Sequence, residues 1–222
     1  MNKEAVSKHY DRALVLPVYG SLQTITRMVG SQNEVLDVGC ASGYLGRLLI
    51  PFGNVVYGID GNREAVEEAR TWYEDVVCMD LNQLGNEKPF SGKLFDIIIF
   101  ADVLEHLVEP DQTLRFFQSF LKPGGKTIVS LPNVALWRVR LNLLFGKFNY
   151  TDYGVLDRTH LHLYTFASAR QLLANAGYHV SASHGAMNLF LFGVLAELFP
   201  FLRSLLSIHI VLEATKRFPE KN

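Results

Sequence analysis

Short apolar runs recur along the chain and predict the strands of a buried sheet. Five of them lie at 34–38, 54–60, 75–80, 95–101 and 126–132. They are rich in Val and Ile and carry almost no charge before their carboxyl ends, which is typical of parallel strands covered on both faces. Two later runs, at 178–183 and 207–216, predict the closing strands of the same sheet.

Helical patterns lie between these runs. Residues 62–73, 109–121 and 166–177 show apolar positions at helical spacing, and the second and third end at stop signals that contain glycine. An alternation of strands and helices predicts a parallel sheet with helices on both faces, joined by right-handed crossovers. We therefore expect an α/β architecture.

Two segments break this alternation. Residues 134–164 contain aromatic, arginine and histidine residues without a clean period, and so long a connection in a compact domain is usually functional. Residues 187–206 are apolar on every side, but Glu197, Pro200 and Arg203 interrupt them too often for a bilayer span. We expect this segment to be buried against the fold or a second subunit, with lipid contact as the alternative.

Composition and charge narrow the class of protein. With 222 residues, of which 49% are hydrophobic and 19% charged, we expect a single domain. A net charge of −1 provides no overall field for nucleic acid or an anionic membrane. Cys40 and Cys78 make no disulfide framework, and 1–14 has no apolar core of signal-peptide length, so a cytoplasmic location is expected.

The first predicted strand ends in a turn of small residues. Gly39, Ala41 and Gly43 let a ligand approach the backbone closely, at the sheet edge where ligands bind in such folds. A dinucleotide fingerprint has glycine in place of Ala41, and the sequence has no phosphate-binding GxxxxGK[ST] loop. Asp37, just before the turn, would repel a pyrophosphate and suits an ammonium or sulfonium cation instead.

Two further aspartates follow the next strands. Asp60 closes the second strand, where a carboxylate can accept both hydroxyls of a ribose. Asp80 follows the third strand, within reach of an adenine amino group, and Met79 and Leu81 offer apolar contacts to the ring. Any one such aspartate is also typical of a helix cap or a solvated loop. Together, on successive strands, they predict an adenosine site.

These segments resemble the class I S-adenosylmethionine-dependent methyltransferases. The resemblance covers about 34–180 and rests on the motifs VLDVGCASG, GID, CMDL, FDIIIFADVLEHL and LKPGGKTIVSLPN. It implies S-adenosylmethionine as the cofactor, with the turn beside its methionine part, the next two strand ends on its ribose and adenine, and the fourth near the reacting methyl. The cofactor-binding residues implied are Asp37, Gly39, Ala41, Gly43, Asp60, Gly61, Met79, Asp80, Leu81, Phe100, Ala101 and Asp102, joined by Tyr10 from a YD segment that closes over the cofactor.

The resemblance also implies a fold. We expect a Rossmann-like, doubly wound, seven-stranded sheet, mostly parallel with an antiparallel last strand, in one domain over 1–222. An N-terminal helical lid is expected at 1–30, a substrate cap after the fifth strand at 134–164, and an apolar helical insertion at 186–206.

Histidines are the candidate catalytic residues. Methyl transfer from a sulfonium is an in-line displacement, and a hydroxyl nucleophile benefits from a general base. His106, His160 and His162 are the candidates for that base. In an extended segment, alternation points His160 and His162 to the same side. A purely structural role at a helix start is equally compatible with His106.

The same region raises the question of a metal. Asp102, Glu105, His106 and His160 resemble the metal ligands of small-RNA 3′-end 2′-O-methyltransferases, which have glutamate at the position of Asp102. The EHL motif is also frequent in metal-free methyltransferases, so we expect no metal. The near-neutral charge disfavours an RNA acceptor, because phosphate contacts need clustered Lys and Arg.

The acceptor must be recognised largely by 134–164. This segment resembles methyltransferases of sugar and cell-surface glycan pathways, and also the W-type methionine-biosynthesis proteins, which share its PN…WRVRL stretch. The leading hypothesis is O-methylation of a small molecule or glycan by a monomer or homodimer, with peripheral membrane contact through 187–206 left open. The alternatives are a non-catalytic partner protein of the W type and a metal-dependent RNA 2′-O-methyltransferase. Candidate acceptor-binding residues are Arg138, Tyr150, Arg158 and Tyr164.

Overall fold

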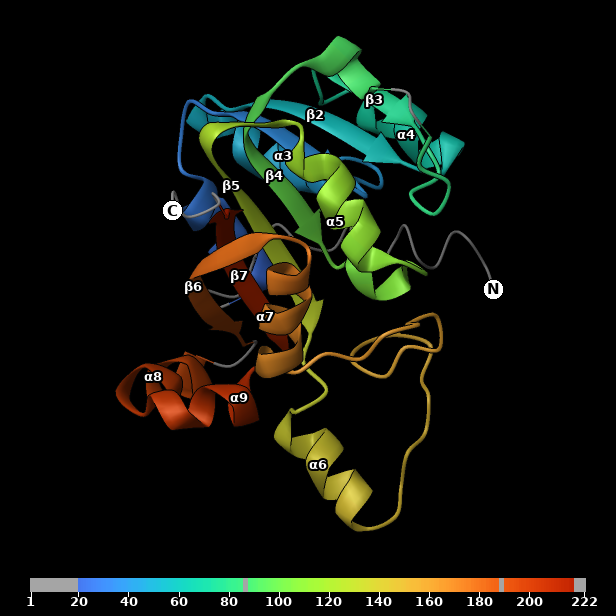
Figure 1. Ribbon diagram of the computed structural model, residues 1–222. Helices are drawn as coiled ribbons and strands as arrows, with labels where there is room; N and C mark the ends of the chain where they lie inside the picture. The colour runs from blue at the N-terminus through green and yellow to red at the C-terminus, as the bar shows by residue number, and fades with distance from the viewer. Residues whose placement is uncertain (1–19, 86–87, 188–189, 218–222) are drawn as a thin grey trace, which may run out of the picture.

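A seven-stranded sheet forms the centre of the protein (Figure 1). The structure, a computed structural model, describes residues 20–85, 88–187 and 190–217, so Tyr10 and most of the expected lid lie outside the described residues. The strand order is β3-β2-β1-β4-β5-β7-β6, and β7 runs antiparallel to both of its neighbours. The expected fold class is confirmed. The strands are β1 Glu34–Val38, β2 Val55–Asp60, β3 Asp75–Cys78, β4 Phe95–Ala101, β5 Leu121–Pro132, β6 Tyr178–Ala186 and β7 His209–Lys216.

Helices and short 3₁₀ turns connect the strands. The predicted helices are all present but shorter than their sequence patterns: the one expected over 62–73 ends at Ala69, and the one over 109–121 ends at Gln118. The described helices are α2 Ser21–Val29, α3 Tyr44–Leu49, α4 Arg63–Ala69, α5 Pro110–Gln118, α6 Trp137–Leu144, α7 Phe166–Asn175, α8 Phe190–Leu198 and α9 Arg203–Leu206. The 3₁₀ turns are η1 Ile50–Phe52, η2 Pro89–Gly92, η3 Leu104–His106 and η4 Pro200–Leu202.

Two apolar cores lie on opposite faces of the sheet. Helices α5 and α7 pack on one face, and α2, α3 and α4 pack on the other. The alternation along β1 assigns its side chains to the two cores: Leu36 and Val38 join the first, and Val35 joins the second. By the same alternation Asp37 points to the face covered by α3 and α4, which decides its role in the site.

The segment 134–164 contains a helix that the sequence pattern did not predict. Helix α6 projects away from the sheet beyond the end of β5 (Figure 1). Val139 is the buried residue of this helix, whereas Leu144 is 78% exposed and Phe145 just beyond it is 70% exposed. A helix that buries so little of its surface needs no apolar stripe, so its sequence carries no helical period.

The apolar segment at 186–206 contains α8, η4 and α9, begins at the last residue of β6, and is only partly covered. Met187 and Ala196 are buried, but Leu198, Phe199 and Phe201 are 66%, 47% and 76% exposed. Burial against this chain's own fold therefore accounts for part of the segment. No helix among the described residues is long and apolar enough to cross a membrane.

Candidate active site

The turn between β1 and α3 brings the backbone close to the ends of the neighbouring strands. Gly39, Ala41 and Gly43 have φ values of 80°, 45° and 85°, in the region that favours glycine. A Cβ on Gly39 would lie 2.3 Å from Cγ2 of Val103, which follows β4. The turn therefore packs its backbone closely against the residue that follows β4, which requires glycine at position 39.

Asp60, at the end of β2, is tied directly to that turn. Its Oδ2 accepts a hydrogen bond from the Ala41 amide at 2.9 Å, and its Oδ1 accepts one from the Asn62 amide at 2.8 Å. A carboxylate has about four acceptor positions, so about two remain available. A half-buried carboxylate with spare acceptor positions fits the vicinal hydroxyls of a ribose.

The end of β3 lies beside the end of β2, as the sequence predicts. The Met79 amide donates to the Asp60 carbonyl at 3.0 Å, and a Cβ on Gly61 would lie 3.5 Å from the Met79 carbonyl oxygen. Asp80 is exposed and its Oδ1 accepts from the Asn82 amide at 2.9 Å. Asp60, Gly61, Met79 and Asp80 thus meet at one edge of the sheet.

Asp37 faces away from this edge and into the protein. It is 2% exposed, and its Oδ2 accepts a hydrogen bond from the Tyr73 hydroxyl at 2.6 Å. The Tyr73 hydroxyl in turn accepts from the Gly46 amide at 3.0 Å. Burial raises the pKa of Asp37 to about 7, against the Tyr73 hydrogen bond, and the nearby Asp60 carboxylate adds to the rise. In this structure Asp37 supports the turn through Tyr73, and its direct contact with a cation stays a prediction.

The end of β4 combines core residues with one strained aspartate. Phe100 is fully buried against the Phe117 ring, with ring centroids 5.8 Å apart, so only its main chain remains to border a ligand. Asp102 has a φ of 54°, an uncommon conformation that clusters at functional sites. Ser130 donates to Oδ1 of Asp102, and Nε2 of His209 lies 3.6 Å from its Oδ2. Sequence reasoning missed both partners, which come from β5 and β7.

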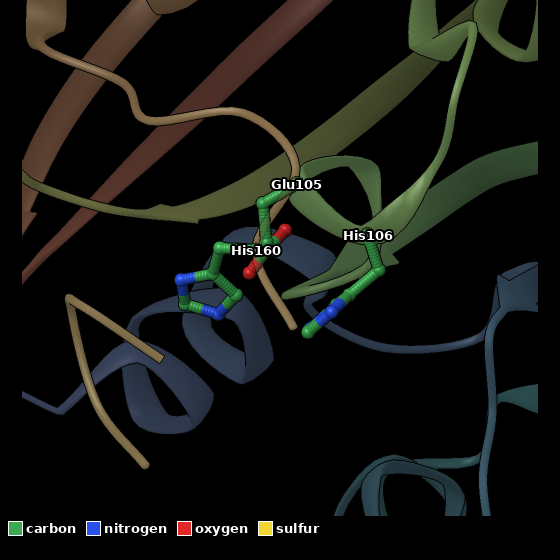
Figure 2. A group of neighbouring side chains, drawn as sticks. All are labelled: Glu105, His106 and His160. Carbon is green, nitrogen blue, oxygen red and sulfur yellow. The ribbon is translucent and has the colours of Figure 1, made fainter. Parts of the chain in front are cut away.

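Two of the three candidate histidines meet beside a buried glutamate (Figure 2). The rings of His106 and His160 are edge to face, with centroids 4.8 Å apart. Glu105 is fully buried, and neither carboxylate oxygen has a hydrogen-bond partner among the described residues. Burial raises the pKa of Glu105 well above its usual value, and the Asp102 carboxylate adds to this rise. Burial lowers the pKa of His160, with His106 contributing.

His162 is not part of this cluster. Its Nε2 lies 3.3 Å from the Val108 carbonyl oxygen, and its ring packs near Tyr164. The condition under which His160 and His162 would point to one side, an extended segment, is not met: Leu161 lies in a bend, and the Leu161 and His162 amides both donate to the Glu105 carbonyl. The alternation of side chains that underlies that expectation holds only for a strand.

The candidate acceptor-binding residues are spread over the cap. Arg158 forms an exposed ion pair with Asp152 at 2.7 Å, and Arg138 stacks on Trp137. Tyr150 is exposed and packs against Phe148. Tyr164 is buried in the core on the α5 and α7 face, which raises its pKa to about 12. The pairing of Thr151 with Asp157 places Tyr150 and Arg158 near each other, whereas Tyr164 packs in the core.

A separate cavity of about 370 Å³ lies among α2, β6, α8 and α9. Its lining includes Arg27, His184 and Arg203, and none of the residues predicted for the site. The sequence-predicted chemistry gathers instead at the carboxyl ends of β1 to β4, where ligands bind in folds of this kind. We therefore place the candidate active site there.

Comparison with known proteins gives consistent matches. Residues 12–183 match a family described as "Methyltransferase domain". A ubiquinone biosynthesis O-methyltransferase of Coxiella burnetii is 31% identical over 107 residues, covering 46% of this chain and 44% of that protein. The match thus spans less than half the length of this curated relative.

Solved structures share the fold at low sequence identity. Magnesium protoporphyrin IX methyltransferase from Synechocystis, solved with bound S-adenosylhomocysteine, is 20% identical with a TM-score of 0.61, over 89% of this chain and 82% of that one. A TehB-like methyltransferase from Corynebacterium glutamicum is 19% identical with a TM-score of 0.63, over 96% and 97% of the two chains.

Proposed function

This chain belongs to the class I S-adenosylmethionine-dependent methyltransferase family, and on that premise we propose that it methylates an oxygen of a small-molecule or glycan acceptor. The observation that carries the proposal is the direct link between the glycine turn and the ribose-type carboxylate, the hydrogen bond from the Ala41 amide to Asp60. It joins the two elements that would hold the methionine and nucleoside parts of one ligand.

S-adenosylmethionine supplies a sulfonium-bound methyl group when it is bound. The available acceptor positions of Asp60 are proposed to receive the ribose hydroxyls, and Met79 and Leu81 to border the adenine ring. Gly39, Ala41 and Gly43 are proposed to lie along the methionine part. Asp37 contributes through Tyr73 and the packing beneath this turn.

The histidine pair is suited to an acceptor hydroxyl. Oγ1 of Thr159 donates to Asp157 at 2.7 Å, so it accepts from Nδ1 of His106 at 3.2 Å, and the Thr159 carbonyl also lies 3.2 Å from that nitrogen. In its neutral form His106 therefore carries its proton on Nδ1, which leaves the lone pair of Nε2 to accept a proton. Nε2 of His106 would take the proton of the acceptor hydroxyl as its oxygen accepts the methyl group that bound S-adenosylmethionine would supply.

Two features bear on the class of acceptor. The matched Coxiella burnetii protein is named as an O-methyltransferase, which supports an oxygen acceptor. The net charge of −1 supports a small or neutral acceptor over a nucleic acid. We propose that 134–164 forms the cap over this acceptor, because its returning end carries His160 into the site.

Two measurements test the proposal. Isothermal titration with S-adenosylhomocysteine should show one site per chain, and purified protein should transfer radiolabelled methyl groups to an acceptor in a hydroxyl-rich small-molecule or glycan pool. His106→Gln should lower turnover with little change in S-adenosylhomocysteine affinity. Binding without turnover on any acceptor would instead favour a non-catalytic partner protein, and no binding would contradict the cofactor assignment.

A further inference from the structure

Glu105 is a buried carboxylate without a visible compensating group. It is fully buried at the start of the loop after β4, and neither oxygen has a hydrogen-bond partner among the described residues. Burying a polar or charged group in this way is costly unless something pairs with it. Figure 2 shows the carboxylate and the imidazoles of His106 and His160 gathered in one place. We propose that Glu105, His106 and His160 bind one divalent transition-metal ion.

Both imidazoles are oriented as metal ligands usually are. Nδ1 of His160 lies 3.2 Å from the Val155 carbonyl oxygen, so this nitrogen carries a proton, as Nδ1 of His106 does towards Thr159. A backbone carbonyl on one ring nitrogen fixes the tautomer and leaves the lone pair of the other for a metal. Nε2 of each ring is therefore the ligand atom.

The distances permit a single ion. One ligand atom from each of the three residues lies within 4.8 Å of the others. Around an ion with bonds of about 2.0–2.2 Å, tetrahedral ligands lie about 3.4 Å apart, so small side-chain rotations close the shell. Asp102 is not a member of the set, because Ser130 and His209 already engage its carboxylate.

The donor set indicates which ions fit. Two imidazoles and one carboxylate suit Zn²⁺, Mn²⁺, Fe²⁺ or Co²⁺, whereas Mg²⁺ and Ca²⁺ prefer oxygen ligands. Three protein ligands leave at least one coordination position open, and the exposed side of His106 gives solvent and ligands access to it. An acceptor with two adjacent oxygens would chelate an ion in such a position.

The ion site goes beyond the proposed methyl transfer and does not depend on it. Only the role of the ion in seating the acceptor oxygen rests on the proposed function. With the ion bound, Nε2 of His106 would be a ligand and not the base of the proposed function. The ion would instead lower the pKa of the acceptor hydroxyl, and solvent water would take its proton.

Metal titration of the full chain tests the site. Protein stripped with a chelator and dialysed is titrated with Zn²⁺, Mn²⁺ and Mg²⁺ by calorimetry, and with Co²⁺ by visible absorption. We expect one Zn²⁺ or Co²⁺ per chain, weaker Mg²⁺ binding, and d–d bands of imidazole-ligated Co²⁺. Glu105→Gln, His106→Ala and His160→Ala should each weaken Zn²⁺ binding at least tenfold. His179→Ala, at an exposed position of β6, should leave Zn²⁺ binding unchanged.

The outcomes separate this inference from the proposed function. Wild-type protein that binds S-adenosylhomocysteine, and is therefore folded, but takes up no ion would overturn the metal site. So would Glu105→Gln protein with wild-type Zn²⁺ affinity. Metal binding without methyl transfer would leave the site intact and contradict the proposed function alone, and turnover unaffected by a chelator that removes the bound ion would overturn its role with the acceptor.

Discussion

Tyr73 donates its hydroxyl proton to Oδ2 of Asp37 across 2.6 Å, although the two residues are 36 positions apart. The same hydroxyl accepts from the Gly46 amide in α3, so one buried ring joins β1 to the helix that follows the glycine turn. There is no room for a larger neighbour, because a Cβ on Gly46 would lie 1.8 Å from the Tyr73 ring. The turn at the active site is therefore supported by a packed polar network.

Removal of the Tyr73 hydroxyl should destabilise the protein. Tyr73→Phe leaves the Asp37 carboxyl and the Gly46 amide without their partner in a buried setting, at a cost of about 1–3 kcal/mol in the free energy of unfolding. Urea denaturation measures the loss. Tyr150→Phe, on a 54% exposed ring, is the matched control and should change stability by less than about 0.5 kcal/mol. Equal effects of the two variants would contradict a supporting role for Tyr73.

Asp37 should make stability depend on pH. Its pKa is raised from 3.8 to about 7 in the folded protein. Between these two pH values the folded state therefore holds a proton that the unfolded chain has released. The associated stability is complete below about pH 4 and is lost as pH rises towards 7, a difference of about 4 kcal/mol. Unfolding free energies of wild type and Asp37→Asn, compared from pH 4 to 8, isolate this effect. A difference that does not change with pH would show that Asp37 is ionised in the folded state.

Asp60→Ala should weaken binding of S-adenosylhomocysteine by about 1–3 kcal/mol, since ribose hydroxyls would be left without their acceptor and the Ala41 amide without its own. Titration calorimetry gives the affinity directly. Asp75→Asn is the control: Asp75 begins β3, at the end of the strand away from Met79, and the variant should bind S-adenosylhomocysteine as wild type does. Unchanged affinity in Asp60→Ala would place the ribose elsewhere.

Gly39→Ala should disturb the site through Val103. The added Cβ would lie 2.3 Å from Cγ2 of Val103, and the alanine backbone would have to adopt a φ of 80°. We expect at least tenfold weaker S-adenosylhomocysteine binding. Val103→Ala in the same chain should restore part of the affinity, because it relieves the contact but not the backbone strain. A double variant no better than Gly39→Ala would assign the whole effect to the backbone.

The strands were accessible from sequence because buried strands have a strong local signature, whereas the antiparallel last strand was expected only from the family resemblance. The strand at 34–38 was predicted to the residue, and the strand at 126–132 lies within β5. Helix α6 was not predictable in this way, since its exposed Leu143 and Leu144 leave no apolar stripe. Local pattern also extended α4 over 70–73, which hid Tyr73 as a partner of the active-site turn.

The site was predictable where neighbouring strands bring residues together, and less so where distant loops do. Asp60 and Met79 meet because β2 and β3 are adjacent and parallel. The contact between His106 and His160 depends on how the chain returns over 53 intervening residues, which include α5, β5 and α6, and the place of His162 depends on the bend at Leu161. Nothing in the local sequence shows that Glu105 has no hydrogen-bond partner, because that follows only from its full burial.

The anchoring of the cap has a consequence for how this protein can diversify. The Val134 amide donates to the Tyr164 carbonyl at 2.8 Å, and the Leu161 amide donates to the Glu105 carbonyl at 2.8 Å. The first bond joins the two ends of the segment to each other, and the second ties its returning end to η3, so 137–155 lies between fixed points. Insertions, deletions or replacement of residues within 137–155 would leave both of these hydrogen bonds in place. Such changes would replace the surface that we propose to meet the acceptor and would leave the proposed reaction centre in place.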